Sequence, residues 1–326
     1  MSSIPLIDLT DALTLGASRS ADVAAQLRGA ATTSGFFYIA NHGVPQALID
    51  RQFALGQALL ALPLATREAL SIQNSPNNRG FEITGMQTLD ADAHPDLKES
   101  FQCGKRWPED HPYVKAGYFG YGGNQWPDAL PQAPVQCDEY IDHVMGLAQR
   151  LMQLLALSLD LPETYFDHTV ETPMMTLRMI RYPAHPKEAD ERTFGAGAHT
   201  DWGALTLLLQ DEHGGLEVQM PEGNWEAAVP IPGTFVVNLG DMIPRWTNGL
   251  YHSNPHRVRN LAPAGATRYS IPFFFDPDYT AMISPVPGSV PHGESPRHAT
   301  CTAGEHLVEK YTTTFGIKKA QGAAAG

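Results

Sequence analysis

"MMTLRMIRY", residues 174–182, is where the hydrophobic pattern of the chain changes from a period of about 3.6 residues to a period of about two. Before this stretch, apolar side chains over residues 134–160 recur at helical spacing. After it, short apolar runs follow one another, separated by turn signals and without helical patterns between them. The strands that we expect lie at residues 174–182, 203–209, 215–219, 234–239, 256–260 and 268–275. Many short strands at this spacing predict a β-sandwich or a jelly-roll barrel.

The chain before residue 130 has a mixed pattern. Residues 20–33 and 46–60 have helical spacing, and a short apolar strand is expected between them at residues 36–39. Residues 74–128 are rich in Gly, Pro, Asn and Asp, which is typical of long functional loops. This part of the chain therefore adds helices and loops to the predicted strands.

The fold class that we expect is mostly β with flanking helices, around a double-stranded β-helix (jelly-roll) core. A length of 326 residues is within the range of one large β domain with added helices. We expect a single domain over residues 1–326. Its helical and loop part covers residues 1–130, and its jelly-roll core covers residues 170–280.

Composition limits the possible partners. The hydrophobic fraction of 43% and the charged fraction of 17% are typical of a globular protein with ample core-forming material. The net charge of −13 argues against nucleic acid or an anionic membrane as a partner. Three widely spaced cysteines do not form a disulfide framework, and we find neither a signal-peptide pattern nor an apolar run of ~20 residues. We expect a cytoplasmic protein with a small-molecule substrate, and nothing in the sequence indicates its oligomeric state.

The motif GAHTDWG, residues 197–203, contains the first candidate for chemistry. His199 and Asp201 are two residues apart, so an extended backbone places both side chains on one face. One imidazole and one carboxylate can bind a divalent transition metal when a third ligand is near. Two histidines and one carboxylate form the facial triad of non-haem Fe(II) oxygenases.

The third ligand has two candidates in TNGLYHSNPHRV, residues 247–258. His252 and His256 are four residues apart, which would place both on one face of a regular strand. Residues 253–255 interrupt the strand pattern, so parity does not decide between the two histidines.

Five segments carry a signal beyond these individual residues. They are IPLIDL (4–9), SGFFYIANHGVP (34–45), HTDWGALTLLLQD (199–211), GDMIPRWTNGLYHSNPHRV (240–258) and RYSIPFFFDP (268–277). In this order they resemble the isopenicillin N synthase-like family of Fe(II)- and 2-oxoglutarate-dependent oxygenases, and the resemblance spans nearly the whole chain. It implies a distorted jelly roll with Fe(II), the co-substrate 2-oxoglutarate and O2 at the barrel mouth. It also implies that the iron ligands are His199, Asp201 and His256, because the family's ligand directly precedes Arg-Val, and that no further catalytic residue is needed.

A carboxylate receptor is expected on the strand that contains RYSIPFF. Alternation places Arg268 and Ser270 on the same face, where a guanidinium and a hydroxyl can hold one carboxylate. The resemblance implies that this pair binds 2-oxoglutarate, together with Tyr182. Many plant members of the family have asparagine where this chain has Ile180. The form Ile-Arg-Tyr-Pro is closer to isopenicillin N synthase, which uses no 2-oxoglutarate.

The expected function is oxidation of a small organic metabolite by hydroxylation, desaturation or cyclisation. One alternative is an Fe(II) oxidase that needs no co-substrate, and a more distant alternative is a non-catalytic binding or sensor protein on the same barrel. The substrate cannot be named from the sequence. Its pocket is expected to include Arg79, Phe81, Arg178, Ile180, Phe194, Trp246 and Phe274.

Overall fold

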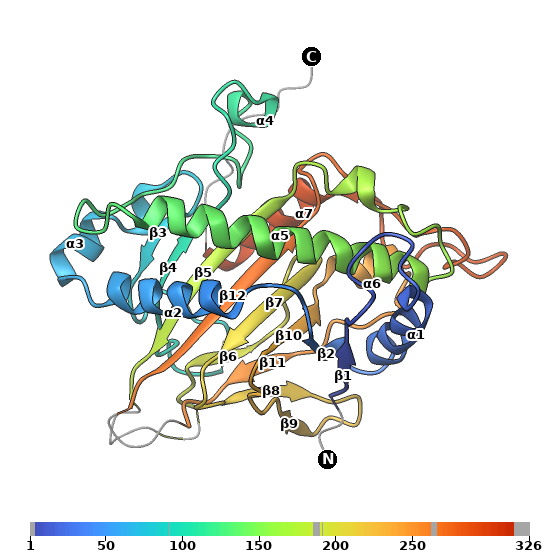
Figure 1. Cartoon of the computed structure of the whole chain (residues 1–326), viewed down its shortest axis with the longest axis horizontal. Coiled ribbons are helices and arrows are strands. Elements are labelled where there is room, and N and C mark those ends of the chain that lie inside the picture. The colour runs from blue at the N-terminus through green and yellow to red at the C-terminus, as the bar shows by residue number, and fades with distance from the viewer. Residues whose placement is uncertain (1–3, 91, 185–189, 191, 262–265, 316–326) are drawn as a thin grey trace.

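The computed structural model describes residues 4–90, 92–184, 190, 192–261 and 266–315. Within this part of the chain, the elements form a layer of helices, a large sheet and a smaller sheet (Figure 1). A short two-stranded sheet, β13 (Met282–Ile283) and β14 (Cys301–Thr302), lies outside these layers.

The large sheet has eight strands in the order β1-β2-β10-β7-β12-β5-β4-β3. The strands are β1 (Leu6–Asp8), β2 (Phe36–Ala40), β3 (Gly80–Glu82), β4 (Glu99–Cys103), β5 (Met174–Tyr182), β7 (Leu205–Gln210), β10 (Thr234–Leu239) and β12 (Arg268–Asp276). β1 and β2 are parallel, and the other neighbours are antiparallel. The sheet therefore combines strands from the N-terminal part with strands from the predicted jelly-roll region.

The smaller sheet has four antiparallel strands in the order β6-β11-β8-β9. They are β6 (Ala196–His199), β11 (His256–Val258), β8 (Leu216–Gln219) and β9 (Trp225–Ala227). β6 lies at one edge of this sheet, and β11 has a partner strand on each side.

Three long helices, α1 (Ser20–Ala31), α2 (Gln46–Leu60) and α5 (Ala133–Ser158), form the helical layer, in which α2 and α5 run across the large sheet (Figure 1). α5 buries Ile141, Val144 and Leu151, which belong to the helically spaced stripe expected from the sequence. The other helices are α3 (Leu64–Ala69), α4 (Pro112–Lys115), α6 (Met242–Trp246) and α7 (Ala303–Phe315), with single 3₁₀ turns η1 (Ile72–Asn74) and η2 (Asp167–Thr169). Among the residues that the structure describes, no helix combines the length and apolar character needed to cross a bilayer.

The apolar core lies on both faces of the large sheet, because side chains alternate along its strands. On β5, Leu177 and Met179 belong to the core under the helices, whereas Ile180 and Tyr182 belong to the core between the two sheets. The second core is incomplete at one end, where polar side chains surround a cavity.

Residues 74–128 differ from the expected long loops. They contain β3 and β4, which extend the large sheet beyond β5. Phe81 and Phe101 face one another across these strands with ring centroids 4.8 Å apart, and both are buried. These strands are short and half polar, so their alternation was too weak a signal among the surrounding turn residues.

Candidate metal centre and cavity

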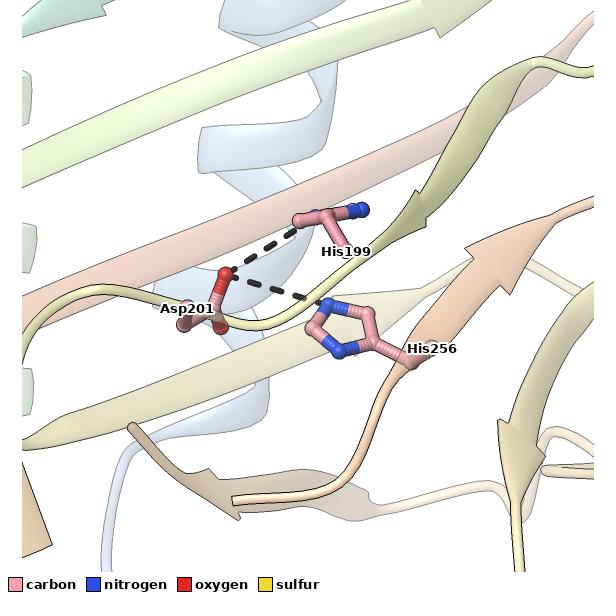
Figure 2. A group of neighbouring side chains, drawn as sticks. All are labelled: His199, Asp201 and His256. Atoms are coloured by element: carbon pink, nitrogen blue, oxygen red, sulfur yellow. Dashed lines mark ion pairs between the residues drawn. The ribbon is translucent and has the colours of Figure 1, made fainter. Parts of the chain in front are cut away.

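The two sheets bring two histidines and an aspartate together at the cavity. His199 ends β6, Asp201 follows two residues later, and His256 begins β11 directly opposite His199 in the strand register. One ligand atom from each residue lies within 4.8 Å of the others. Asp201 Oδ1 is 3.9 Å from His199 Nε2 and 3.8 Å from His256 Nε2, so the three atoms converge without hydrogen bonding (Figure 2).

Hydrogen bonds hold the side chains of Asp201 and His199. In both residues the bonded atom is the one that points away from the expected metal position. Asp201 Oδ2 accepts from Thr206 Oγ1 at 2.5 Å and from Asn238 Nδ2 at 2.8 Å, which leaves Oδ1 available to a metal. His199 Nδ1 lies 2.7 Å from the carbonyl oxygen of Gly197. A carbonyl can only accept, so Nδ1 carries the proton and Nε2 keeps its lone pair. The donor set therefore fits a divalent transition metal with open coordination positions.

Electrostatics favours the protonation states that a metal requires. Burial holds the pKa of His199 well below its usual range, and the nearby His256 lowers it further. Burial alone would raise the pKa of Asp201, but the two imidazoles and the bonds from Thr206 and Asn238 outweigh it, so this pKa is lowered. At neutral pH the site therefore offers a neutral His199 imidazole and a carboxylate.

His252 is not part of this cluster. It is exposed, and its backbone N–H donates to Ala31 O at 2.9 Å. The three residues that do converge are the ones that the resemblance implied.

One end of the cavity contains a buried guanidinium. Arg268 is completely buried, and its Nε donates to Gly214 O. Its Nη1 has no hydrogen-bond partner among the described residues, and no described carboxylate forms an ion pair with it. The guanidinium lies over the Tyr182 ring, 4.5 Å from the centroid, and Ser270 Oγ lies 3.5 Å from Tyr182 Oη. A buried cation without an anion is costly, so this arrangement fits a ligand that brings a carboxylate.

A second arginine lines the cavity four residues before Tyr182 along β5. Arg178 Nη2 forms an ion pair with Glu82, and Arg178 Nε donates to Ser100 Oγ at 2.8 Å. The Ser100 hydroxyl donates to Glu82 at 3.1 Å, which closes a three-residue network across β3, β4 and β5. The charge of Arg178 is therefore already balanced within the protein.

Helix α7 supplies part of the cavity wall that the sequence analysis missed. Leu307 and Tyr311 line the cavity, and the Tyr311 ring packs edge-to-face on Trp202 with centroids 4.9 Å apart. Thr302 and Glu305 exchange hydrogen bonds of 3.1 and 2.8 Å at the start of the helix. This capping box, Thr-x-x-Glu before an apolar run, was a readable signal for the helix.

Asp276, at the end of β12, is a further cavity residue that the sequence analysis missed. Its carboxylate accepts from the Ala204 N–H at 3.1 Å, and burial raises its pKa to about 7. It continues the inward-facing alternation of Arg268 and Ser270, so the strand pattern alone could have identified it.

The seven residues expected in the substrate pocket separate into two groups. Arg178, Ile180 and Phe274 line the cavity, which has a volume of about 150 Å³. The cavity-lining residues of the described chain do not include the other four, which are Arg79, Phe81, Phe194 and Trp246.

Arg79 is buried behind the cavity wall. It donates to the carbonyl oxygens of Cys103, Gly120 and Met175 and to Thr176 Oγ1, at 2.9–3.1 Å. Its guanidinium therefore joins backbone segments and does not face a ligand.

The three aromatic residues of that group pack elsewhere. Phe81 contacts Phe101, and Trp246 lies against Phe166 with ring centroids 4.9 Å apart. Phe194 precedes β6 and has the Arg257 guanidinium 5.3 Å from its ring centroid. Aromatic residue type alone does not predict whether a side chain faces the cavity or the core.

Comparisons with known proteins identify relatives that fit a metal site of this kind. Residues 4–129 match the family profile "non-haem dioxygenase in morphine synthesis N-terminal", and residues 172–277 match "2OG-Fe(II) oxygenase superfamily". The chain is 37% identical to the 2-oxoglutarate-Fe(II) type oxidoreductase hxnY of Emericella nidulans over 97% of this chain and 91% of that protein. It is 36% identical to the 2-oxoglutarate-dependent dioxygenase citB of Monascus ruber over 97% of this chain and 96% of that one.

A solved structure has the same fold. A full-length protein of Neurospora crassa, crystallised in complex with alpha-KG and thymine, matches with a TM-score of 0.84 and 28% identity. The match covers 95% of this chain and 97% of that one.

Proposed function

The chain belongs to the 2OG-Fe(II) oxygenase superfamily, and from this premise we propose how its residues divide the work of a 2-oxoglutarate-dependent dioxygenase. Its cofactor is Fe(II), its co-substrates are 2-oxoglutarate and O2, and its substrate is a small molecule. The relatives favour dependence on 2-oxoglutarate over the co-substrate-independent oxidase.

We assign His199, Asp201 and His256 as the iron ligands. The observation that supports this assignment is the convergence of one ligand atom from each residue. Alanine at any of the three positions should abolish turnover and strongly weaken iron binding, because two ligands hold a metal far more weakly than three. His252→Ala is the matched control and should keep its iron. Metal content after anaerobic desalting measures both, and iron that survives His256→Ala but not His252→Ala would overturn the assignment.

We assign Arg268, Ser270 and Tyr182 to the distal carboxylate of 2-oxoglutarate. The support is the unpartnered Nη1 of a completely buried guanidinium, within the part of the chain that the structure describes. Titration of 2-oxoglutarate into the anaerobic Fe(II) protein should give the weak visible absorption of a keto-acid chelate. Absence of this absorption at millimolar 2-oxoglutarate, with iron bound, would return the protein to the oxidase alternative.

The protein's own residues position the metal and the co-substrate for the reaction. When bound, iron and 2-oxoglutarate supply the oxidant from O2, with release of succinate and CO2. Arg268 fixes one end of the co-substrate, and Thr206 and Asn238 hold Asp201 so that Oδ1 faces the metal position. The apolar side chains of Ile180, Leu208 and other lining residues keep the reacting atoms away from bulk water.

We place the substrate at the Arg178 end of the cavity. The Arg178–Glu82 pair presents a donor beside an acceptor without net charge, which suits an uncharged polar group better than a carboxylate. The Neurospora crassa protein of the same fold has a complex with thymine, a small uncharged ring. Binding of thymine and of benzoate to the anaerobic iron–2-oxoglutarate protein, followed through the chelate absorption, tests this preference. A response to benzoate alone would contradict it.

We keep two further expectations as proposals. One oxygenase domain over the chain is supported by the pairing of β4 with β5 and of β2 with β10, which joins the two parts in one sheet. A cytoplasmic location is supported by three free thiols, at Cys103, Cys137 and Cys301, which suit a reducing compartment.

A further inference from the structure

A buried ion pair is connected to the proposed iron ligand His199 through the backbone of Gly197. Lys98 Nζ and Asp96 Oδ2 are 2.8 Å apart, and their side chains are only 4% and 1% exposed. The other carboxylate oxygen, Asp96 Oδ1, accepts the backbone N–H of Gly197 at 2.9 Å. The carbonyl of the same Gly197 accepts the Nδ1–H of His199 at 2.7 Å. The contacts therefore run from Lys98 through Asp96 and Gly197 to His199.

The position of β6 in its sheet explains why such a support is needed. β6 is an edge strand that pairs only with β11 among the described strands, so backbone groups on its other side lack a strand partner. Asp96 Oδ1 takes the place of that missing strand at Gly197. In addition, Leu97 N donates to Phe194 O at 3.0 Å, just before β6 begins. The segment around Asp96 thus holds the outer side of the strand that ends in His199.

The two histidines are supported in different ways. His256 is on β11, which has β6 on one side and β8 on the other. Its Nδ1 has no hydrogen-bond partner among the described residues. The orientation of His199, in contrast, depends on the Gly197 carbonyl, and the position of Gly197 depends on Asp96.

The ion pair is costly unless it has a role that an apolar pair could not perform. Replacement of a buried ion pair by apolar residues is often neutral or stabilising. An apolar residue at position 96 could not accept the Gly197 N–H. An aspartate without its lysine would be a buried carboxylate without a counter-charge, which is costly.

We propose that Asp96 and Lys98 are positioning residues for the iron ligand His199. Asp96 fixes the backbone at Gly197, which sets the tautomer and the ring orientation of His199, and the ion pair with Lys98 holds Asp96 in place. This inference rests on the assignment of His199 as a ligand in the proposed function. Neither residue needs to contact the metal or the substrate for this role.

The first test measures metal affinity without turnover. Calorimetric titration of the metal-free full chain with Co(II) should give a Kd about 10–100 times higher for Asp96→Ala and for Lys98→Met, the usual effect of losing an outer partner of a metal-bound histidine. Lys98→Arg keeps the charge and should restore most of the affinity. Asp96→Asn keeps the shape and an acceptor oxygen but loses the charge, so it should fall between wild type and Asp96→Ala.

A control separates positioning from general stability. Arg150 and Glu163, whose side chains are 5% and 17% exposed, form another ion pair, 2.7 Å apart, which no described contact links to the three proposed ligands. Glu163→Gln should lower the thermal midpoint and leave the Co(II) Kd unchanged. If Asp96→Ala and Asp96→Asn lowered the midpoint in the same way and also left the Kd unchanged, the positioning role would be wrong.

A spectroscopic test reports on the hydrogen bond itself. In the Co(II) protein, the paramagnetically shifted Nδ1–H signal of His199 should exchange slowly with water in wild type and in Lys98→Arg, and rapidly in Asp96→Asn. Unchanged exchange in Asp96→Asn would contradict the proposal. If His199→Ala itself bound Co(II) as tightly as wild type, the ligand assignment would fail instead, and the positioning role with it.

Discussion

Two arginines line the same cavity in opposite electrostatic states. Arg268 is completely buried and has no anionic partner among the described residues, whereas Arg178 is paired with Glu82 and bonded to Ser100. Sequence pattern does not distinguish them, since both lie on strands and face inward. The difference lies in the neighbouring strands: β3 brings a carboxylate to Arg178, and β7 brings only the neutral Gln210 to Arg268.

This difference in charge balance allows one cavity to separate two ligands. An unbalanced buried cation selects an anionic group strongly, because its own desolvation is offset only when that group arrives. A balanced pair selects by hydrogen-bond pattern, which is weaker and more easily altered. We therefore expect the Arg268 end to be specific for the co-substrate and the Arg178 end to decide which substrate is accepted.

The strongest test of the comparison removes each arginine in turn. Arg268→Ala should raise the Kd for 2-oxoglutarate by about 100-fold or more, because about 3 kcal/mol or more of charge-assisted binding is lost. Arg178→Ala should leave this Kd almost unchanged and affect substrate binding instead. Titration of the anaerobic Fe(II) chelate measures both, and equal losses in the two variants would break the comparison.

The second test removes the internal anion. Glu82→Ala leaves Arg178 buried without its partner, so the free energy of unfolding should fall by about 3 kcal/mol. Gln210→Ala beside Arg268 removes a long contact to the guanidinium and the hydrogen bond that Gln210 Nε2 donates to Ala228 O at 3.1 Å, so it should cost only about 1 kcal/mol. Urea unfolding of the metal-free variants gives both values. A smaller loss for Glu82→Ala than for Gln210→Ala would mean that the Arg178–Glu82 pair contributes no net stability.

The third test gives Arg268 an internal anion like the one that Arg178 already has. Gln210→Glu places a carboxylate next to the Arg268 guanidinium and should weaken 2-oxoglutarate binding about tenfold, because the ligand must now displace an internal anion. The same substitution should stabilise the metal-free protein. Stabilisation without any loss of 2-oxoglutarate affinity would show that Nη1 remains available to the ligand.

A pH-dependent effect is expected from Asp276, an acid in the cavity without a cationic partner among the described residues. Burial raises its pKa to about 7, so between its unfolded pKa of about 3.9 and pH 7 the unfolded state is ionised while the folded state still holds the proton. Its contribution to stability is therefore present at low pH and lost as the pH rises through this window. Asp276→Asn removes the loss and should be more stable than wild type by up to about 4 kcal/mol at pH 8, with no difference at pH 4. Thermal unfolding of the metal-free proteins at both pH values checks the sign.

The sequence predicted the features that depend on local pattern. The period-2 alternation placed Arg268 and Ser270 on one face, and both residues line the cavity. The jelly-roll class followed from the strand spacing. The choice of His256 over His252 needed the resemblance, because the break between them removed the parity argument.

The features that the sequence did not predict depend on contacts between distant segments. Nothing local indicates that Glu82 would neutralise Arg178, or that Asp96 would bond to Gly197, because each pair is about a hundred residues apart in the chain. Arg79 was expected at the substrate and instead bonds to backbone carbonyls, since a motif shows residue type but not direction.

Helix α7 gives the protein a cavity wall that is not built from its large or smaller sheet. Leu307 and Tyr311 reach the cavity from a helix outside the large and the smaller sheet, so neither contributes to strand pairing or to the proposed iron ligands. Evolution, or a laboratory library at these two positions, can therefore explore new substrates while the oxidising chemistry stays intact. A fold arranged in this way can acquire new specificities through a few substitutions, without passing through intermediates that cannot bind iron.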